Sequence, residues 1–310
     1  MTIKKLLLLS IALLPLIAYA ADKPKLTIDE FFNSVGYDAV KISPDGSAVV
    51  IVTDRADWDQ KIFRTDLWLY RVGEHAPGSL IQLTQSGHDR NPEWSPDGRW
   101  IAFISERKAA GAKRTDSDED SKEEETAHLY LISLSGGEAF PITTGEEEVH
   151  AFAWSPDSKT LYFATRQPWT KDQKDAYKKE WKDVKQYRAA ERGDTIFNLD
   201  VADAISHHAA DGSKPADDSD TTPDITPGSR ALANTPWRVE GIDISPDGRR
   251  LAFVTESVSE REERISEFEI YSVDLTNASP DRPPHQITHN EAPEEHIRWA
   301  KDGKHILFDI

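Results

Sequence analysis

Short runs of alternating apolar and polar residues recur along the chain, and each begins at the same polar signal. Five segments align: VKISPDGSAVVIV from Val40, PEWSPDGRWIAFI from Pro92, FAWSPDSKTLYFA from Phe152, IDISPDGRRLAFV from Ile242 and IRWAKDGKHILFD from Ile297. Their common core is an apolar residue, Ser-Pro-Asp-Gly, two variable positions and an alternating apolar run. Alternation with a period of two is typical of strands, so each segment predicts a β-hairpin.

The Ser-Pro-Asp-Gly core has a physical reason to form the turn of that hairpin. Proline fixes φ near −65° at the second position of a type I turn, aspartate suits the third, and glycine tolerates the positive φ that closes the hairpin. Ser158 replaces the glycine once, and Ala300-Lys301 replaces Ser-Pro once. A row of aspartates could also be a set of metal ligands, but the turn explains every residue of the core. We therefore interpret as turn residues Asp45, Asp97, Asp157 and Asp247.

Two more strands follow each hairpin. The third strand is rich in aromatic and apolar residues and is expected at 66–70, 128–132, 195–199 and 269–273. The fourth strand ends in a threonine and is expected at 82–84, 141–143, 224–226 and 286–288. Four consecutive strands in each repeat predict the blade of a β-propeller. A solenoid is disfavoured, because its repeats are shorter and more regular.

The fold class is therefore predicted as all-β, a β-propeller with four complete four-stranded blades and the start of a fifth. Propellers close their ring so that no blade edge is left free. Because this ring is incomplete, we expect the sequence to be the front part of a longer protein. The blades are expected at about 40–91, 92–151, 152–241 and 242–296, with a partial blade at 297–310.

One insertion, at residues 108–126, lengthens the second blade and is polar and acidic. Its Asp116-x-Asp118-x-Asp120 pattern is similar to a calcium-binding loop. However, Ser121 stands where such a loop needs its sharp-turn glycine, and Ala127 stands where it needs the bidentate glutamate. We therefore interpret the segment as a solvated loop.

The third blade carries two further insertions. In residues 169–192, apolar side chains recur at helical spacing, which predicts an amphipathic helix that either packs across the propeller face or walls a substrate cavity. Residues 207–222 have the composition of a disordered loop. Its His207-His208 pair could bind a metal, but a third ligand at useful spacing is lacking, so a solvated pair is favoured. The apolar residues of the helix are Tyr177, Trp181, Val184 and Tyr187.

The N-terminus has the three-part layout of a secretory signal peptide. Two lysines lie in residues 1–5, an apolar run covers residues 6–20, and Ala18-Tyr19-Ala20 forms a small-x-small cleavage site. At about 1.5 Å per residue the apolar run is too short to cross a hydrocarbon core of about 30 Å. We expect cleavage after Ala20, a periplasmic or secreted protein, and a helical lead-in at residues 21–39.

Composition narrows the possible functions. The chain has 37 Lys+Arg and 55 Asp+Glu, a formal net charge of −18, which disfavours general binding of nucleic acid or anionic lipid. The absence of cysteine excludes disulfides, thiol catalysis and cysteine-ligated metals. No G-x-S-x-G, H-E-x-x-H or phosphate-binding glycine motif occurs. We therefore assign no catalytic, cofactor-binding or metal-binding residue and expect no cofactor.

Four segments together resemble the N-terminal half of the prolyl oligopeptidase family, in its bacterial acylaminoacyl-peptidase and dipeptidyl-peptidase branch. They are LTIDEFF, VKISPDGSAVVIVTDR, DLWLYRV and KKEWKDVKQYRAAERGDTIF. The resemblance implies a propeller that gates the access of peptides to a C-terminal α/β-hydrolase domain with a Ser-His-Asp triad, so this chain by itself is expected to be inactive. The rival interpretation is a non-enzymatic periplasmic propeller that mediates protein–protein interaction, because the Tol–Pal propeller also carries W-S-P-D-G repeats.

Some relatives in that family bind the free amine of the substrate through a pair of glutamates on a propeller helix. No such pair occurs in the helix expected within 169–192. The glutamate runs of this chain, Glu146-Glu147-Glu148 and Glu294-Glu295, are expected instead in solvated turns between blades. The expected partners are therefore peptide substrates that act through the hydrolase domain, without nucleic acid and without a membrane after signal cleavage.

Overall fold

The protein is described here by a computed structural model in which the chain divides into two compact units, residues 1–34 and 35–310. The described residues are 25–73, 78–107, 126–145, 147–167, 169–182, 192–211, 226–258, 267–289 and 292–310. The predicted signal peptide at 1–20 lies outside them. In the described part of the chain, the helices are all too short or too polar to cross a membrane.

The first unit contains the short helix α1 (Ile28–Phe32). Thr27 and Glu30, three residues apart, form a capping box at its start. The Glu30 amide donates to Thr27 Oγ1 at 3.1 Å, and the Thr27 amide donates to Glu30 Oε2 at 2.9 Å. Because β1 already begins at Gly36, the helical lead-in is shorter than the expected 21–39.

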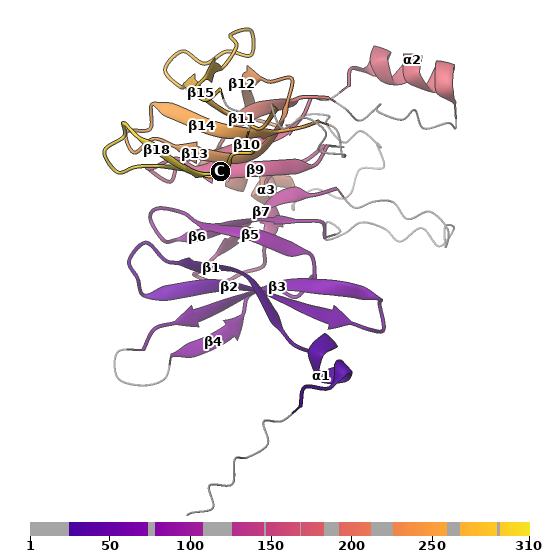
Figure 1. Cartoon of the computed structure of the whole chain (residues 1–310), viewed down its shortest axis with the longest axis vertical. Helices are drawn as coiled ribbons and strands as arrows, with labels where there is room; N and C mark the ends of the chain where they lie inside the picture. Colours follow the sequence, from indigo (N-terminus) through magenta and orange to yellow (C-terminus); the bar gives the residue numbers. More distant parts are fainter. Residues whose placement is uncertain are drawn as a thin grey trace, which may run out of the picture. The chain divides into compact units, whose positions relative to one another are not determined.

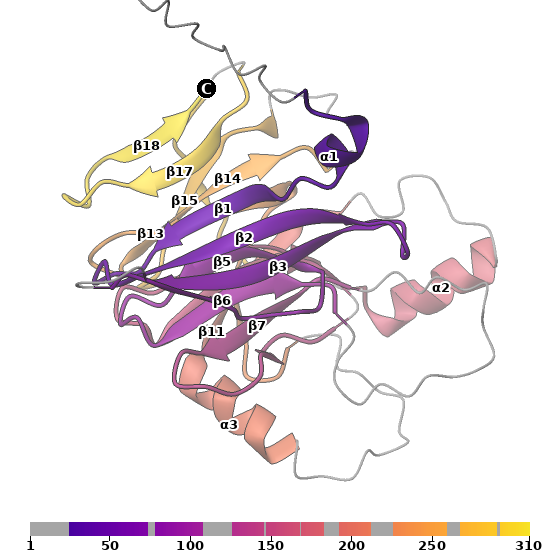
Figure 2. The ribbon, with the colours of Figure 1, turned by 90° about the horizontal axis from the view of Figure 1, so that it is seen from below.

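The second unit consists of antiparallel sheets whose strands follow one another in chain order, and Figures 1 and 2 show these sheets stacked in sequence. Blade 1 comprises β1 (Gly36–Ile42), β2 (Ala48–Asp57), β3 (Ile62–Arg71) and β4 (Ser79–Gln82). Blade 2 comprises β5 (Asp89–Trp94), β6 (Trp100–Ser105), β7 (His128–Ser133) and β8 (Phe140–Pro141).

Blade 3 comprises β9 (Val149–Trp154), β10 (Thr160–Arg166), β11 (Asp194–Asp200) and β12 (Arg230–Asn234). Blade 4 comprises β13 (Arg238–Ile244), β14 (Arg250–Glu256), β15 (Ile270–Asp274) and β16 (His285–Gln286), and blade 5 comprises β17 (Glu295–Trp299) and β18 (Ile306–Asp309). The prediction of an all-β fold built from four-stranded blades is confirmed.

The hydrophobic core lies between neighbouring blades. Val50 and Leu69 of blade 1, for example, form one fully buried cluster with Ile101 and Phe103 of blade 2. Similar clusters join blade 2 to blade 3, blade 3 to blade 4 and blade 4 to the two strands of blade 5. Burial of the alternating apolar residues of the repeats therefore holds successive blades face to face.

The Ser-Pro-Asp turns have the geometry that their sequence predicted. In blade 2, Ser95 Oγ donates to Asp97 Oδ1 at 2.6 Å and accepts from the Trp100 amide at 3.0 Å, while Gly98 has a φ of 71°. The same pair of contacts recurs in blades 1, 3 and 4. The hydrogen bond from Ser43 is the main cause that lowers the pKa of Asp45 to about 2. The aspartates therefore stabilise the turns by accepting these hydrogen bonds.

Consecutive turns also contact one another. A Cβ on Gly98 would lie 4.0 Å from Pro44 of the preceding turn, and Gly248 and Gly303 lie similarly close to the prolines before them. Ser158, which replaces the glycine in blade 3, also has a positive φ of 63°. Its Oγ accepts a hydrogen bond of 2.9 Å from the Asp97 amide in the turn of blade 2. This bond gives a physical reason for a serine at a position that favours glycine.

Two expectations about blade 3 were wrong. Its fourth strand is β12 at Arg230–Asn234, not 224–226. Residues 207–211, expected in a loop, belong to helix α3 (Val201–Asp211), whose residues Val201 and Ala204 are buried against the sheet. In the other blades the threonine that was expected to end the fourth strand lies two residues after its end, and its Oγ1 accepts from an amide of the third strand. The pairs are Leu67–Thr84, Leu129–Thr143 and Ile270–Thr288.

The inserted helix α2 (Lys171–Trp181) confirms the helical periodicity of that segment. It has no buried residue, and Figures 1 and 2 show it standing away from the sheets, so it does not pack across the propeller face. Val184 and Tyr187 lie outside the described residues, as do 108–125 and 212–225, which include the calcium-like Asp116, Asp118 and Asp120.

Candidate functional site

The first strands of the blades line a groove of about 660 Å³. A groove of this size is in the range of small-ligand and short-peptide sites. Its wall combines charged residues and larger apolar ones with small residues such as Ala39, Ala151 and Gly241. The Ser-Pro-Asp turns lie at one end of these strands, and helix α2 lies beyond the other end (Figure 2).

Each first strand carries a β-bulge at nearly the same position. The pairing register shifts between Tyr37 and Ala39 in β1 and between Val239 and Gly241 in β13, and equivalent shifts occur in β5, β9 and β17. Bulges re-aim side chains and are common next to binding sites. One residue from each bulge lines the groove, and these bulge residues are Asp38, Asn91, His150, Glu240 and His296.

A chain of ion pairs crosses the groove nearer the turns. Lys41 Nζ lies 2.5 Å from Glu93, and the Arg298 guanidinium lies 3.6 Å from Glu93 and 3.7 Å from Asp243. We call these four residues the charge bridge. Burial raises the pKa of Asp243, although the Trp299 amide, which donates to Asp243 Oδ2 at 2.6 Å, opposes this change.

His150 is the buried member of the bulge residues. Its Nδ1 lies 2.7 Å from Asp194 Oδ2, and its Nε2 lies 3.2 Å from Glu148 Oε1. Burial opposes protonation of this imidazole, but the hydrogen bonds to the two carboxylates outweigh burial and raise its pKa. Asp194 Oδ2 also accepts from the Val239 amide at 2.8 Å, so the cluster ties blade 3 to blade 4. Two arginines complete it around Glu148, Arg166 at 3.5 Å and Arg238 at 3.8 Å.

No protein-family model matches the chain. Its sequence is similar to the peptidase YuxL of Bacillus subtilis, with 28% identity over 139 residues, which cover 45% of this chain and 19% of YuxL. It is also similar to dipeptidyl-peptidase 5 of Porphyromonas gingivalis, with 25% identity over 131 residues, which cover 41% of this chain and 17% of that protein. Each match therefore spans less than a fifth of the length of the relative.

Among solved structures, the fold is similar to that of the tricorn protease, with a TM-score of 0.55 and 13% identity over 88% of this chain and 24% of that one. At this identity the likeness concerns the fold alone. This chain is a β-propeller with peptidases among its sequence relatives.

The propeller buries or pairs several glutamates that were expected in solvated turns. Glu148 is held by His150, whose hydrogen bond is the main cause that lowers its pKa to about 2. Glu147 lies 2.6 Å from the Arg192 guanidinium. Glu294 is fully buried and accepts from Thr288 Oγ1 at 2.5 Å. The expectation was therefore wrong for these three residues, whereas Glu295 is exposed and Glu146 lies outside the described residues.

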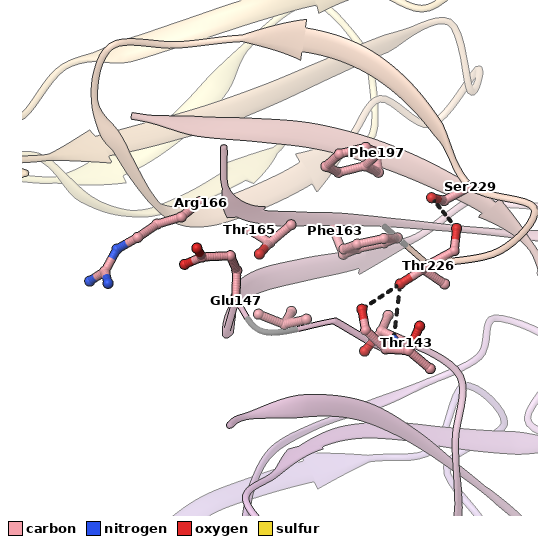
Figure 3. A pocket seen from close by; sticks show the side chains of 10 residues that line it. Thr143, Glu147, Phe163, Thr165, Arg166, Phe197, Thr226 and Ser229 are labelled. Carbon is pink, nitrogen blue, oxygen red and sulfur yellow. Dashed lines mark hydrogen bonds between the residues drawn. The ribbon is translucent and has the colours of Figure 1, made fainter. Parts of the chain in front are cut away.

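A small slot lies beside the Glu147 pair (Figure 3). Phe163 and Phe197 stack at its base with ring centroids 5.4 Å apart, and Thr226 Oγ1 accepts from the Thr144 amide at 3.0 Å. Arg166 points away from the slot in Figure 3. The slot has a volume of about 10 Å³, enough for one water molecule. It is therefore too small for a substrate, and the groove is the candidate site.

The His207-His208 pair, weighed above as a metal site, lies in helix α3. Within the described residues, no three His, Asp or Glu side chains are grouped as metal ligands. His208 is exposed, and its ring stacks on Phe140 with centroids 4.3 Å apart, so the His207-His208 pair is not simply solvated. The sequence contained no signal for the groove itself, since its residues are far apart in the chain.

Proposed function

We propose that this chain is the substrate-gating β-propeller of an exported serine peptidase that acts on peptides. The observation that carries the proposal is sequence similarity to two peptidases in a chain whose blades enclose a groove of peptide size. Acyl transfer by a Ser-His-Asp triad would take place in an α/β-hydrolase domain, outside these 310 residues. The role of the propeller is to orient the peptides that it admits and to exclude larger ones.

The groove supports this role through its walls. Each first strand pairs with a second strand on one side only, so its other edge carries backbone amides and carbonyls toward the groove. An extended peptide offers the same groups and can pair with such an edge. Small residues such as Ala39 and Gly241 leave room for its backbone, and charged residues at the bulges and the charge bridge fit a polar, hydrated ligand.

Export is part of the proposal. It rests on the layout of residues 1–20, which lie outside the described part of the chain, and on the absence of cysteine. N-terminal sequencing of the protein recovered from the producing cell tests it. A mature chain that begins at Ala21 is expected, and recovery of an intact Met1 from the cytoplasm would contradict export.

The reading frame beyond the codon for Ile310 tests the peptidase assignment. We expect it to encode a G-x-S-x-G motif, and we expect the encoded protein to hydrolyse short peptides and to lose this activity to a serine-directed inhibitor. A stop codon after a few more blades, without that motif, would contradict the proposal. That outcome would favour a non-enzymatic propeller that docks protein partners.

A further inference from the structure

The charge bridge joins blades that are not neighbours in the chain. Glu93 lies on β5 of blade 2, whereas Arg298 lies on β17 of blade 5, and their 3.6 Å contact crosses the groove. Asp243 of blade 4 and Lys41 of blade 1 extend the contact on either side. Four of the five blades thus contribute one charged residue each, two positive and two negative, at the same level of the groove.

The backbone beneath the bridge is firmly positioned. Trp94 Nε1 donates to the Lys41 carbonyl at 3.0 Å, and Trp154 Nε1 donates to the Glu93 carbonyl at 3.2 Å. Each indole therefore fixes the first strand of the preceding blade at the level of the bridge. The charged ends are freer, since about a third of the Lys41 and Glu93 side chains and 59% of the Arg298 side chain are exposed.

Blade 3 lacks a charge at this level. The residue that precedes its turn tryptophan is Ala153, at the position that Glu93 and Arg298 occupy in their blades. Ala153 lines the groove and has no side chain long enough to cross it. On the blade 3 side, the groove is therefore lined by a short, uncharged side chain at the level of the bridge.

We propose that the charge bridge sets the width of the groove, and so limits the cross-section of the peptide that enters it. This inference rests on the proposed function only for the nature of the ligand. Exposed ion pairs are weak, and the loss of one changes an equilibrium by about 2- to 5-fold. A contact of that strength holds the groove narrow most of the time and still opens readily, as an adjustable size limit requires. It also weakens as salt rises.

Because the chain contains no cysteine, a single introduced thiol can be labelled selectively, and its labelling rate measures access to the groove. In an Ala39→Cys variant of the full 310-residue chain, the single thiol lies in the groove wall two residues before Lys41, on the same face of β1. The rates of its reaction with a small maleimide and with a bulky polymer-linked maleimide are measured with the native bridge and with Arg298→Gln. We expect the substitution to raise the bulky-reagent rate by about 2- to 5-fold, the factor that corresponds to an exposed ion pair, and to leave the small-reagent rate unchanged.

Two control experiments show whether the change in labelling rate comes from the charge bridge. Lys159→Cys places the thiol on an exposed turn outside the groove, where Arg298→Gln should change neither rate. Salt should raise the bulky-reagent rate at position 39 while the bridge is intact and have little effect after Arg298→Gln. If Ala39→Cys fails to fold, Ala153→Cys reports from the opposite wall with Glu93→Gln as the bridge variant.

A bulky-reagent rate that is the same with and without Arg298, or that rises equally at Lys159→Cys, would overturn the role of the bridge. Labelling does not depend on peptidase activity. An unchanged labelling rate would therefore refute the role of the bridge without contradicting the proposed function. A missing G-x-S-x-G motif would contradict the proposed function without contradicting the role of the bridge.

Discussion

The turn of blade 3 allows a quantitative test of how a positive φ affects the stability of the fold. Ser158 and Gly98 occupy the same position of the repeat, with φ of 63° and 71°. Gly98 has no strain, and a Cβ there would meet only Pro44 at 4.0 Å, an ordinary contact. Ser158 bears the strain of a side chain in the left-handed region, but its Oγ accepts from the Asp97 amide at 2.9 Å. Substitutions at the two sites therefore separate strain from hydrogen bonding.

Gly98→Val should lower the free energy of unfolding by about 1–2 kcal/mol or more, because a β-branched residue tolerates positive φ poorly. Ser158→Ala keeps the strain and loses the hydrogen bond, which costs about 0.5–1.5 kcal/mol. Ser158→Gly loses the same bond but also removes strain of about 1 kcal/mol. It should therefore remain close to the wild type and be more stable than Ser158→Ala.

Urea denaturation monitored by tryptophan fluorescence measures the three variants, with a common m-value as the control for a common unfolded state. The expected order of midpoints is wild type close to Ser158→Gly, then Ser158→Ala, then Gly98→Val. Equal midpoints for Gly98→Val and the wild type would refute the positive φ. Equal midpoints for Ser158→Ala and Ser158→Gly would refute strain at position 158.

Three other outcomes are expected. Because the pKa of His150 is raised, its stabilisation is complete below about pH 6.5 and is lost as pH rises through that pKa, so the Tm gap between wild type and His150→Gln should shrink at alkaline pH. Gly193→Ala should destabilise by about 1–3 kcal/mol or more in urea denaturation, since its Cβ would lie 1.9 Å from the Thr235 carbonyl, whereas Gly36→Ala meets only ordinary contacts. The purified chain should not hydrolyse aminoacyl chromogenic substrates, and inhibitor-sensitive turnover that stays with it would contradict this.

Local features of the fold were accessible from the sequence because their causes are local. The Ser-Pro-Asp-Gly turn depends on residues within five positions, as the contacts of Ser95 with Asp97 and the Trp100 amide show. The α1 capping box depends on two residues three positions apart. Helix α3 also had a local signal, since Val201, Ala204, Ile205 and His208 recur at helical spacing, but the polar residues after it suggested a loop.

Strand β12 had a weaker signal. Its sequence is RALAN, and alanine and asparagine are poor strand formers. It forms a strand because it pairs with the edge of β11, where Ile196 pairs with Ala233 and Phe197 pairs with Ala231. Burial of Leu232 and Ala233 then supplies the stabilisation that intrinsic propensity does not.

The alternating pattern and the turns of the sequence thus determined the strands, their order and the blades, because each depends on neighbours in the chain. Only the stacking of the blades decided the rest. It buries Glu294 and brings Glu148 of blade 3 to Arg238 of blade 4, although solvated turns are the usual place for such glutamates. It also brings Glu93 to Arg298 across the groove. Charged residues can be identified in a sequence. Which of them form ion pairs depends on which strands of different blades face one another, and that is decided by the tertiary structure.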